Sequence, residues 1–183
     1  VISFDLTSAG GYNTWPISAQ IPSATPADLL NSIMGPWHDI DPSIAGNIYY
    51  NTYGIAPNRA FVVSWDQVAM FSSTCNFQIA TSQIVLYETT NIIDIYIQNK
   101  PLCSTWNSGA AIEGIQNCTG TQAVAVPGRN YPTQWTATND GQRFTPTVAP
   151  QYNLTWYAPP NTAIGTALTV SVCPTTTTTY TAT

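Results

Sequence analysis

The chain has 183 residues, of which 44% are hydrophobic and only 7% are charged, with a net charge of −5. The length allows one large β-domain, or one domain with part of a second, and the apolar content is enough for a packed core. The low charge does not indicate disorder, because disordered chains are poor in aromatic residues and this one has six Trp, ten Tyr and five Phe. No stretch approaches the roughly 20 continuous apolar residues of a membrane-spanning helix.

The cationic residues are scattered along the sequence, at Arg59, Lys100, Arg129 and Arg143. Nucleic-acid binding needs clustered Lys and Arg to neutralise phosphates, so we expect no nucleic-acid partner and no polybasic contact with a membrane. Surface polarity must come from Thr, Ser, Asn and Gln, a composition typical of extracellular β-rich proteins. The expected partners are therefore neutral polymers such as glycans, or the surfaces of other proteins.

The cysteines form no Cys-x-x-Cys pair, and they stand at Cys75, Cys103, Cys118 and Cys173. Since His38 is the only histidine, a zinc site is not expected, whereas disulfides are typical of exported chains. We predict a Cys75–Cys103 bridge that links the two ends of a hairpin. Cys118 could instead compete for either partner, and Cys173 could pair with a cysteine beyond residue 183.

In chain order, residues 1–6 alternate as a strand, and residues 7–24 form a loop rich in Gly and Pro. Thr25-Pro26-Ala27-Asp28 then has the pattern of a helix start, because Thr can cap, Pro fits the first helical position and Asp can return a bond. The helix would continue over residues 29–33 and end at Gly35-Pro36. We expect this short helix to be the only one.

From residue 47 onward, strand-like segments follow one another closely, over residues 47–53, 59–65, 83–88, 92–97, 110–116 and 122–126. Alternation in the second segment places Phe61, Val63 and Trp65 on one face. The third and fourth segments predict a hairpin around residues 89–91, and the last two pair around residues 117–120. Strands at this spacing predict an all-β fold, an antiparallel β-sandwich with one short helix.

A linker bracketed by Pro146 and Pro150 predicts a boundary that divides the chain into residues 1–147 and 148–183. The second part is too short for a complete sandwich, so we expect an incomplete unit. Because both termini fall in strand-like sequence, we also expect the chain to be a piece of a larger protein.

Two strands are expected in the second part, over residues 154–157 and 167–172. The Thr run at residues 175–179 follows them and ends at Tyr180. A low-complexity Thr run can be a glycosylated stalk. We favour a turn that leads into a β-branched strand, because Tyr180 continues the alternation.

Asp39 and Asp41 are the strongest candidate metal ligands. An Asp-x-Asp pair on a loop offers two hard oxygen ligands to Ca²⁺, to which Asn47 or Asp66 could add another. Ca²⁺ needs more oxygen ligands than these residues supply. The alternative is that Asp41 begins a turn and bonds to nearby backbone.

No catalytic residue is predicted. His38 lies beside Asp39, but the Gly-x-Ser-x-Gly elbow of a hydrolytic nucleophile does not occur in the sequence, and a packed histidine is the commoner outcome. Glu88, Asp94 and Glu113 could supply the carboxylate pair of a glycosidase. Solvated carboxylates on a polar face are more common, so a glycoside hydrolase is kept only as an alternative and we expect no enzyme.

Aromatic residues in the expected loops and strand ends are candidate ligand platforms, at Trp37, Trp106, Trp135 and Tyr131. Exposed rings stack on sugar faces and anchor protein interfaces. The alternative is that these rings plug the core where loops close. A lectin-like carbohydrate-binding module, with or without Ca²⁺, is therefore an alternative function.

Three segments in the same order resemble nidogen-like (NIDO) domains. Gly35–Asp41 with Asn47–Tyr50 is similar to the family's aromatic-x-Asp-x-Asp and Val-Tyr-Tyr signature. Arg59–Val68 is similar to its Val-Val-x-Trp-Asp-x-Val strand, and Asn76–Tyr87 to its Asn-x-Phe-Gln and Ile-Val-Leu strand. The resemblance covers residues 1–147, without the family's opening strands, and implies an extracellular adhesion module.

Residues 164–180 resemble the Ig-like or PKD-like repeats of very large adhesins, which Bacteroidota-type bacteria export to their surface, often through type IX secretion. The combination implies a secreted adhesion or structural module of a gliding-associated or filament adhesin at the bacterial cell surface. The implied partners are extracellular glycans, surface proteins, neighbouring subunits and the secretion machinery.

Overall fold

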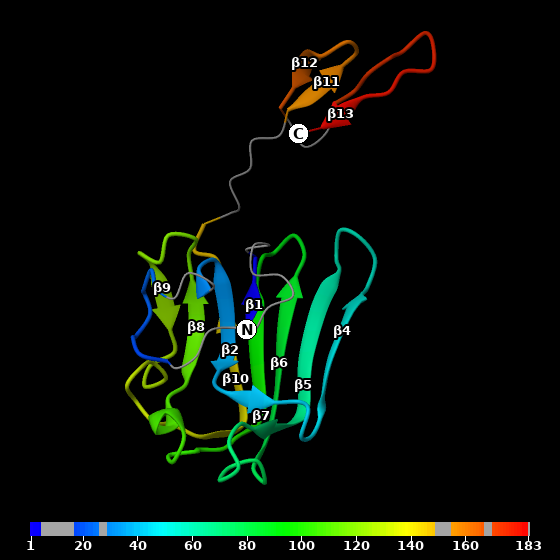
Figure 1. The fold of residues 1–183 in the computed structure, drawn as a ribbon. Coiled ribbons are helices and arrows are strands. Elements are labelled where there is room, and N and C mark those ends of the chain that lie inside the picture. Colours follow the sequence, from blue (N-terminus) through cyan, green and yellow to red (C-terminus); the bar gives the residue numbers. More distant parts are fainter. Residues whose placement is uncertain (5–16, 26–28, 149–154, 167–169, 183) are drawn as a thin grey trace. The chain divides into compact units, whose positions relative to one another are not determined.

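The computed structural model describes residues 1–4, 17–25, 29–148, 155–166 and 170–182. Within these ranges the chain is all-β and its antiparallel sheets form a sandwich-like arrangement, which confirms the predicted fold class. Contacts divide the chain into two compact units, Val1–Thr145 and Pro146–Thr183. Figure 1 shows the strands of each unit. The described residues include no helix with the length and hydropathy that a membrane span requires.

One sheet of the first unit has four antiparallel strands in the order β1-β2-β8-β9. The strands are Ile2–Ser3 (β1), Ser32–Trp37 (β2), Ile112–Gln116 (β8) and Ala123–Ala125 (β9). The pairing of β8 with β9 confirms the strand pair predicted around residues 117–120.

The predicted short helix is wrong at residues 32–33, because they belong to strand β2, Ser32–Trp37. Ile33 lies opposite Ile2 and Ile115 in the neighbouring strands. Alternation along β2 buries Ile33 toward the second sheet and Met34 in a cluster on the other side. Burial on both faces outweighs helix-start chemistry, which is a weak local preference. Residues 26–28, where the helix would begin, lie outside the described residues.

The other sheet of the first unit has the order β10-β7-β6-β5-β3, and β4 also pairs with β5. Its strands are Ile40–Asp41 (β3), Asn47–Tyr53 (β4), Ala60–Met70 (β5), Ile79–Tyr87 (β6), Ile93–Lys100 (β7) and Ala137–Phe144 (β10). The β6–β7 pairing confirms the hairpin predicted around residues 89–91. Strand β4 is exposed along its whole length.

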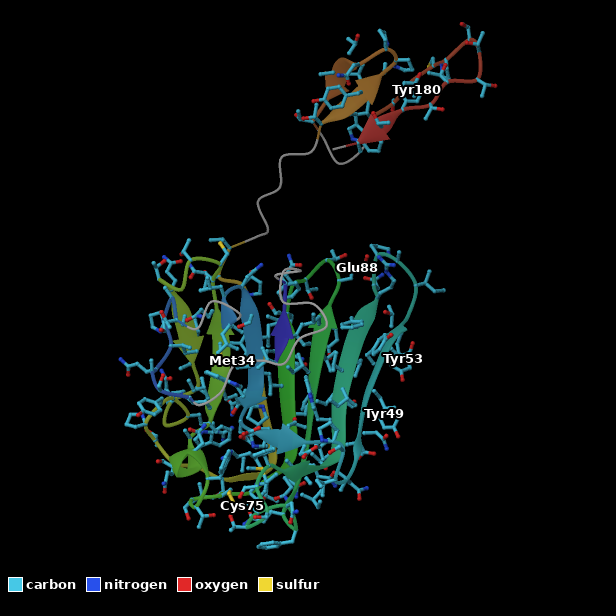
Figure 2. All side chains as sticks on the ribbon, viewed as in Figure 1. Met34, Tyr49, Tyr53, Cys75, Glu88 and Tyr180 are labelled. Atoms are coloured by element: carbon cyan, nitrogen blue, oxygen red, sulfur yellow. A yellow bond between two sulfur atoms is a disulfide. The ribbon has the colours of Figure 1, made fainter. Side chains whose placement is uncertain are left out.

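The core between the two sheets is aliphatic. Ile33 of β2 packs with Ile84 of β6 and with Ile95 and Ile97 of β7. A side chain at Gly35 would meet Ile84 and Ile95 at 2.9–3.0 Å, so β2 passes close to the second sheet there. Figure 2 shows Met34 on β2 within this unit.

A disulfide joins Cys75 to Cys103 and confirms the predicted pairing. Both cysteines are buried and pack with Met70 and Ala80, so the bridge ties the segment after β5 to the segment after β7. The other two cysteines, Cys118 and Cys173, are exposed and free.

Replacing both Cys75 and Cys103 by serine is expected to lower the free energy of unfolding by about 2–4 kcal/mol, because the cross-link constrains the unfolded chain. Urea unfolding followed by tryptophan fluorescence measures the change. The control Cys118→Ser changes an exposed free thiol and leaves the midpoint in place. Equal midpoints for the double variant and the control would contradict this role of the bridge.

The second unit contains a small antiparallel sheet in the order β12-β11-β13. Its strands are Trp156–Ala158 (β11), Thr162–Gly165 (β12) and Thr181–Ala182 (β13). The strand predicted over residues 167–172 is wrong at residues 170–172, which are not in a strand, and residues 167–169 lie outside the described residues. The Thr run bends at residues 175–176 before β13 begins.

Candidate functional site

The chain crosses from one sheet of the first unit to the other between β2 and β3. Strand β2 ends at Trp37 and β3 begins at Ile40, so the crossing consists of His38 and Asp39. Strand β3 then pairs with the end of β5, with Ile40 opposite Met70. The crossing therefore places the aromatic-x-Asp-x-Asp segment at a border that both sheets share.

A cleft of about 700 Å³ opens beside this crossing. Trp37 lines it from the end of β2, and Ile48 and Trp65 line it from β4 and β5. Ile48 and Trp65 are cross-strand partners, so their side chains lie on the same face. Asp39 and Asp41 also line the cleft, which combines apolar walls with carboxylates in the manner of a small-ligand site.

Asp39 is held in position by two contacts. Trp106 Nε1 donates a hydrogen bond to Asp39 Oδ2 at 2.8 Å, and the backbone N–H of Phe71 donates to the Asp39 carbonyl at 3.1 Å. The Trp106 and Phe71 rings contact each other at a centroid distance of 5.0 Å. Partial burial raises the pKa of Asp39, and the Asp41 charge adds to this, while the Trp106 hydrogen bond acts in the opposite direction.

Asp41 adopts the turn that the sequence offered as its alternative role. Its Oδ1 accepts hydrogen bonds from Ser43 N at 2.9 Å and from Ser43 Oγ at 2.6 Å. Among the described residues, no group of three or more His, Cys, Asp or Glu side chains could hold a metal ion. Asp66 lines a different groove from Asp39 and Asp41. Calcium binding by Asp39 and Asp41 stays a prediction.

His38 is mostly buried but also lines the cleft. Burial lowers its pKa from 6.5 to about 3, and the positive charge of Lys100 adds to this effect. His38 Nδ1 has no hydrogen-bond partner within the described part of the chain. The imidazole is therefore neutral near pH 7.

The candidate aromatic platforms occupy different places. Trp37 is almost fully buried but lines the cleft. Trp106 donates a hydrogen bond to Asp39, which lines the cleft. Tyr131 is partly buried against the cluster around Met34. Trp135 is only 8% exposed, and its Nε1 donates to the Ala111 carbonyl at 2.9 Å, so it lies in the core and away from the cleft.

The three carboxylates weighed for glycosidase chemistry each form an ion pair with a different arginine. Glu88 pairs with Arg59 at 2.5 Å, Asp94 with Arg143 at 2.7 Å and Glu113 with Arg129 at 2.6 Å. Asp94 and Glu113 are buried, so the expectation of solvated carboxylates is wrong for these two. The burial of Asp94 and Glu113 could not be predicted from the sequence, because the arginine that pairs with each carboxylate lies far from it along the chain.

Ile48, Trp65 and Phe71 are among the lining residues that the sequence did not mark as part of a site. Ile48 and Trp65 join the cleft through the β4–β5 register, and Phe71 through its contact with Trp106. Alternation had already placed Trp65 inward. The sequence contains no local indication of the register between β4 and β5, because no short turn motif joins these two strands.

Comparison with protein-family models identifies the first unit and part of the second. The model described as NIDO related matches residues 1–157. The chain belongs to the NIDO-related family. This match supports the sequence resemblance for the nidogen-like part, and together with the disulfide it indicates an extracellular module of structural or adhesive type. No curated protein and no solved structure matches the chain.

Proposed function

We propose that this NIDO-related chain is a non-catalytic adhesion module of a large bacterial cell-surface protein, and that the cleft at the β2–β3 crossing holds its ligand. The observation that carries this proposal is the composition of the cleft. Trp37, Ile48 and Trp65 supply apolar walls, and Asp39 is oriented in it by Trp106. Rigid aromatic walls with a few oriented polar groups are typical of binding sites.

The absence of a catalytic role is part of the same proposal. The carboxylates Glu88, Asp94 and Glu113 are each neutralised by a separate arginine, which suits ion pairs that hold the fold. The neutral, buried His38 is packed rather than poised to exchange a proton with solvent. Both features favour binding over hydrolysis.

The proposed setting is a gliding-associated or filament adhesin that reaches the surface by type IX secretion. Residues 164–180, which resemble Ig-like or PKD-like repeats, support this setting, together with the small sheet of β11, β12 and β13. The complete reading frame tests it. Tandem repeats and a C-terminal secretion domain would support the setting, and a flanking hydrolase domain would contradict it.

Ile48→Asp is expected to reduce adhesion at least several-fold, because it places a charge on an apolar wall of the cleft. Ile48 is 46% exposed on β4, so the variant keeps the core intact. The measurement is the attachment under flow of beads that carry the full chain, on cellulose, chitin, agarose, mucin and collagen surfaces.

The matched control is Ile55→Asp, which makes the same change at a residue that is 85% exposed and does not line the cleft. The control is expected to attach like the natural chain. Attachment to none of the five surfaces, or equal attachment by the two variants, would overturn the cleft as the adhesive site.

A further inference from the structure

The outer face of the larger sheet carries a second groove, of about 400 Å³. Its lining includes Tyr49, Ser64, Gln83 and Tyr96. Strand register places these residues in one row across four strands, because Tyr49 pairs with Ser64, Ser64 with Gln83, and Gln83 with Tyr96. The adjacent row, to which Trp65 belongs, points to the opposite face and into the cleft. The two sites lie on opposite faces of this sheet, and Trp65 and Ser82 border both of them.

The row has aromatic rings at its ends and hydrogen-bonding groups at its centre. Neighbouring strands lie about 4.8 Å apart, so Tyr49 and Tyr96, three strands apart, are separated by roughly 14 Å. Gln83 Nε2 donates to Ser64 Oγ at 2.8 Å, which fixes the two central side chains relative to each other. Thr81 and Gln98 add a hydroxyl and an amide at the border of the groove.

Tyr96 is held with its ring along the sheet. Its hydroxyl donates to Asp94 Oδ2 at 2.9 Å, and Asp94 in turn accepts two hydrogen bonds from Arg143 at 2.7 Å. Gly141 lies directly across from Tyr96 in β10, and a side chain there would meet Tyr96 Cδ1 at 3.3 Å. The ring thus covers the glycine and is still 43% exposed. A ring fixed before binding loses little conformational entropy when a ligand stacks on it.

The charge of the residues that line the groove indicates which class of ligand it can bind. Among the described residues that line it, Asp66 is the only one with a formal charge near pH 7, and no cation is present. Anionic polymers are therefore disfavoured. A protein interface would place its aromatic anchors at the centre, whereas here the centre consists of Ser64 and Gln83. Sugar rings offer apolar faces for the tyrosines and hydroxyls for the central groups.

We propose that this face binds a neutral glycan chain that runs across the strands from β4 to β7. Sugar rings stack on Tyr49 and Tyr96, and sugar hydroxyls exchange hydrogen bonds with Ser64, Gln83 and Asp66. The covering of Gly141 gives Tyr96 a structural role in addition. Tyr49 lies on the exposed strand β4, is 55% exposed and covers no glycine (Figure 2). The proposed glycan site lies on the opposite face of the sheet from the cleft, and its proposed role is separate from adhesion through the cleft.

The test measures binding of the full chain to immobilised cellohexaose, laminarihexaose, xylohexaose and mannohexaose, with the anionic hexamer of galacturonic acid for comparison. Tyr49→Ala and Tyr96→Ala are each expected to weaken the strongest interaction about tenfold, since one stacked ring contributes on the order of 1.4 kcal/mol. Tyr96→Phe keeps the ring and is expected to bind within about threefold of the natural chain.

The matched control is Tyr50→Ala. Tyr50 is the neighbour of Tyr49 on β4, is 76% exposed and faces the other side, because it pairs with Val63. Unchanged binding by Tyr50→Ala, with loss for the two groove variants at unchanged melting temperature, supports the proposal. Binding to none of the neutral hexamers, preference for the anionic hexamer, or equal binding by all variants would overturn the proposal.

Discussion

Arg129→Ala is expected to lower the free energy of unfolding by about 3–5 kcal/mol, the cost of breaking a buried ion pair by removing one partner. Arg129 Nη1 donates to Glu113 Oε2 at 2.6 Å, and its Nη2 forms an ion pair with Asp140. The Glu113 side chain is fully buried. Alanine would therefore leave a carboxylate in the interior without its counter-charge, and would also remove the guanidinium from the Trp135 ring.

Urea unfolding measures this loss, and a second variant identifies its cause. Burial raises the pKa of Glu113, and the Arg129 hydrogen bond opposes that rise. Adding Glu113→Gln to Arg129→Ala removes the buried charge, so the double variant is expected to be more stable than Arg129→Ala alone. Arg59→Ala, which breaks the exposed pair with Glu88, is the control and is expected to cost far less. A stability within about 1 kcal/mol of the natural chain for Arg129→Ala would contradict this account of the pair.

Acidification is expected to destabilise the fold through His38. Burial lowers its pKa to about 3, against 6.5 in the unfolded chain. Between these values the unfolded chain binds more protons, so this contribution to stability is complete above pH 6.5 and is lost as the pH falls toward 3. Because one pKa unit corresponds to about 1.4 kcal/mol, His38 accounts for roughly 4 kcal/mol of destabilisation at pH 3.

The contribution of His38 is isolated by comparing the natural chain with His38→Gln at each pH. Glutamine does not titrate, so the stability difference between the two proteins is expected to shift in favour of the variant below pH 6.5. Carboxylates such as Asp94, whose pKa is lowered by its hydrogen bonds with Arg143, titrate in both proteins and cancel in the difference. A difference that does not change between pH 7 and pH 4 would show that His38 is accessible to protons in the folded state.

The sequence predicted those parts of the fold that depend on residues close together along the chain, such as the β6–β7 hairpin. Continuous β-branched and aliphatic runs defined strands β6 and β7, and the short turn between them fixed their pairing. The Cys75–Cys103 bridge followed from the placement of these strands. Residues 32–33 were misjudged as helical because a capping motif carries only local information, whereas β2 forms where Ile33 and Met34 are buried on opposite faces.

The candidate site was predictable only in part for the same reason. Trp37, Asp39 and Asp41 are close in sequence and share one loop and its flanking strands, so composition could point to them. Ile48 and Trp65 reach the cleft through the register of β4 on β5, which depends on pairing over a longer distance. No sequence feature shows whether Trp135 is an exposed ligand platform or a core residue. In the structure Lys100 and Arg129 lie over its ring, so it is a core residue.

The central claim is that the first unit binds its ligand in the cleft at the β2–β3 crossing. The most direct test is the fraction of chain-coated beads that stay attached under flow, compared between Ile48→Asp and Ile55→Asp on the surface that retains the natural chain best. The proposed function predicts at least a several-fold loss for Ile48→Asp and none for Ile55→Asp. Equal retention of the two variants would place the adhesive surface elsewhere and contradict the claim.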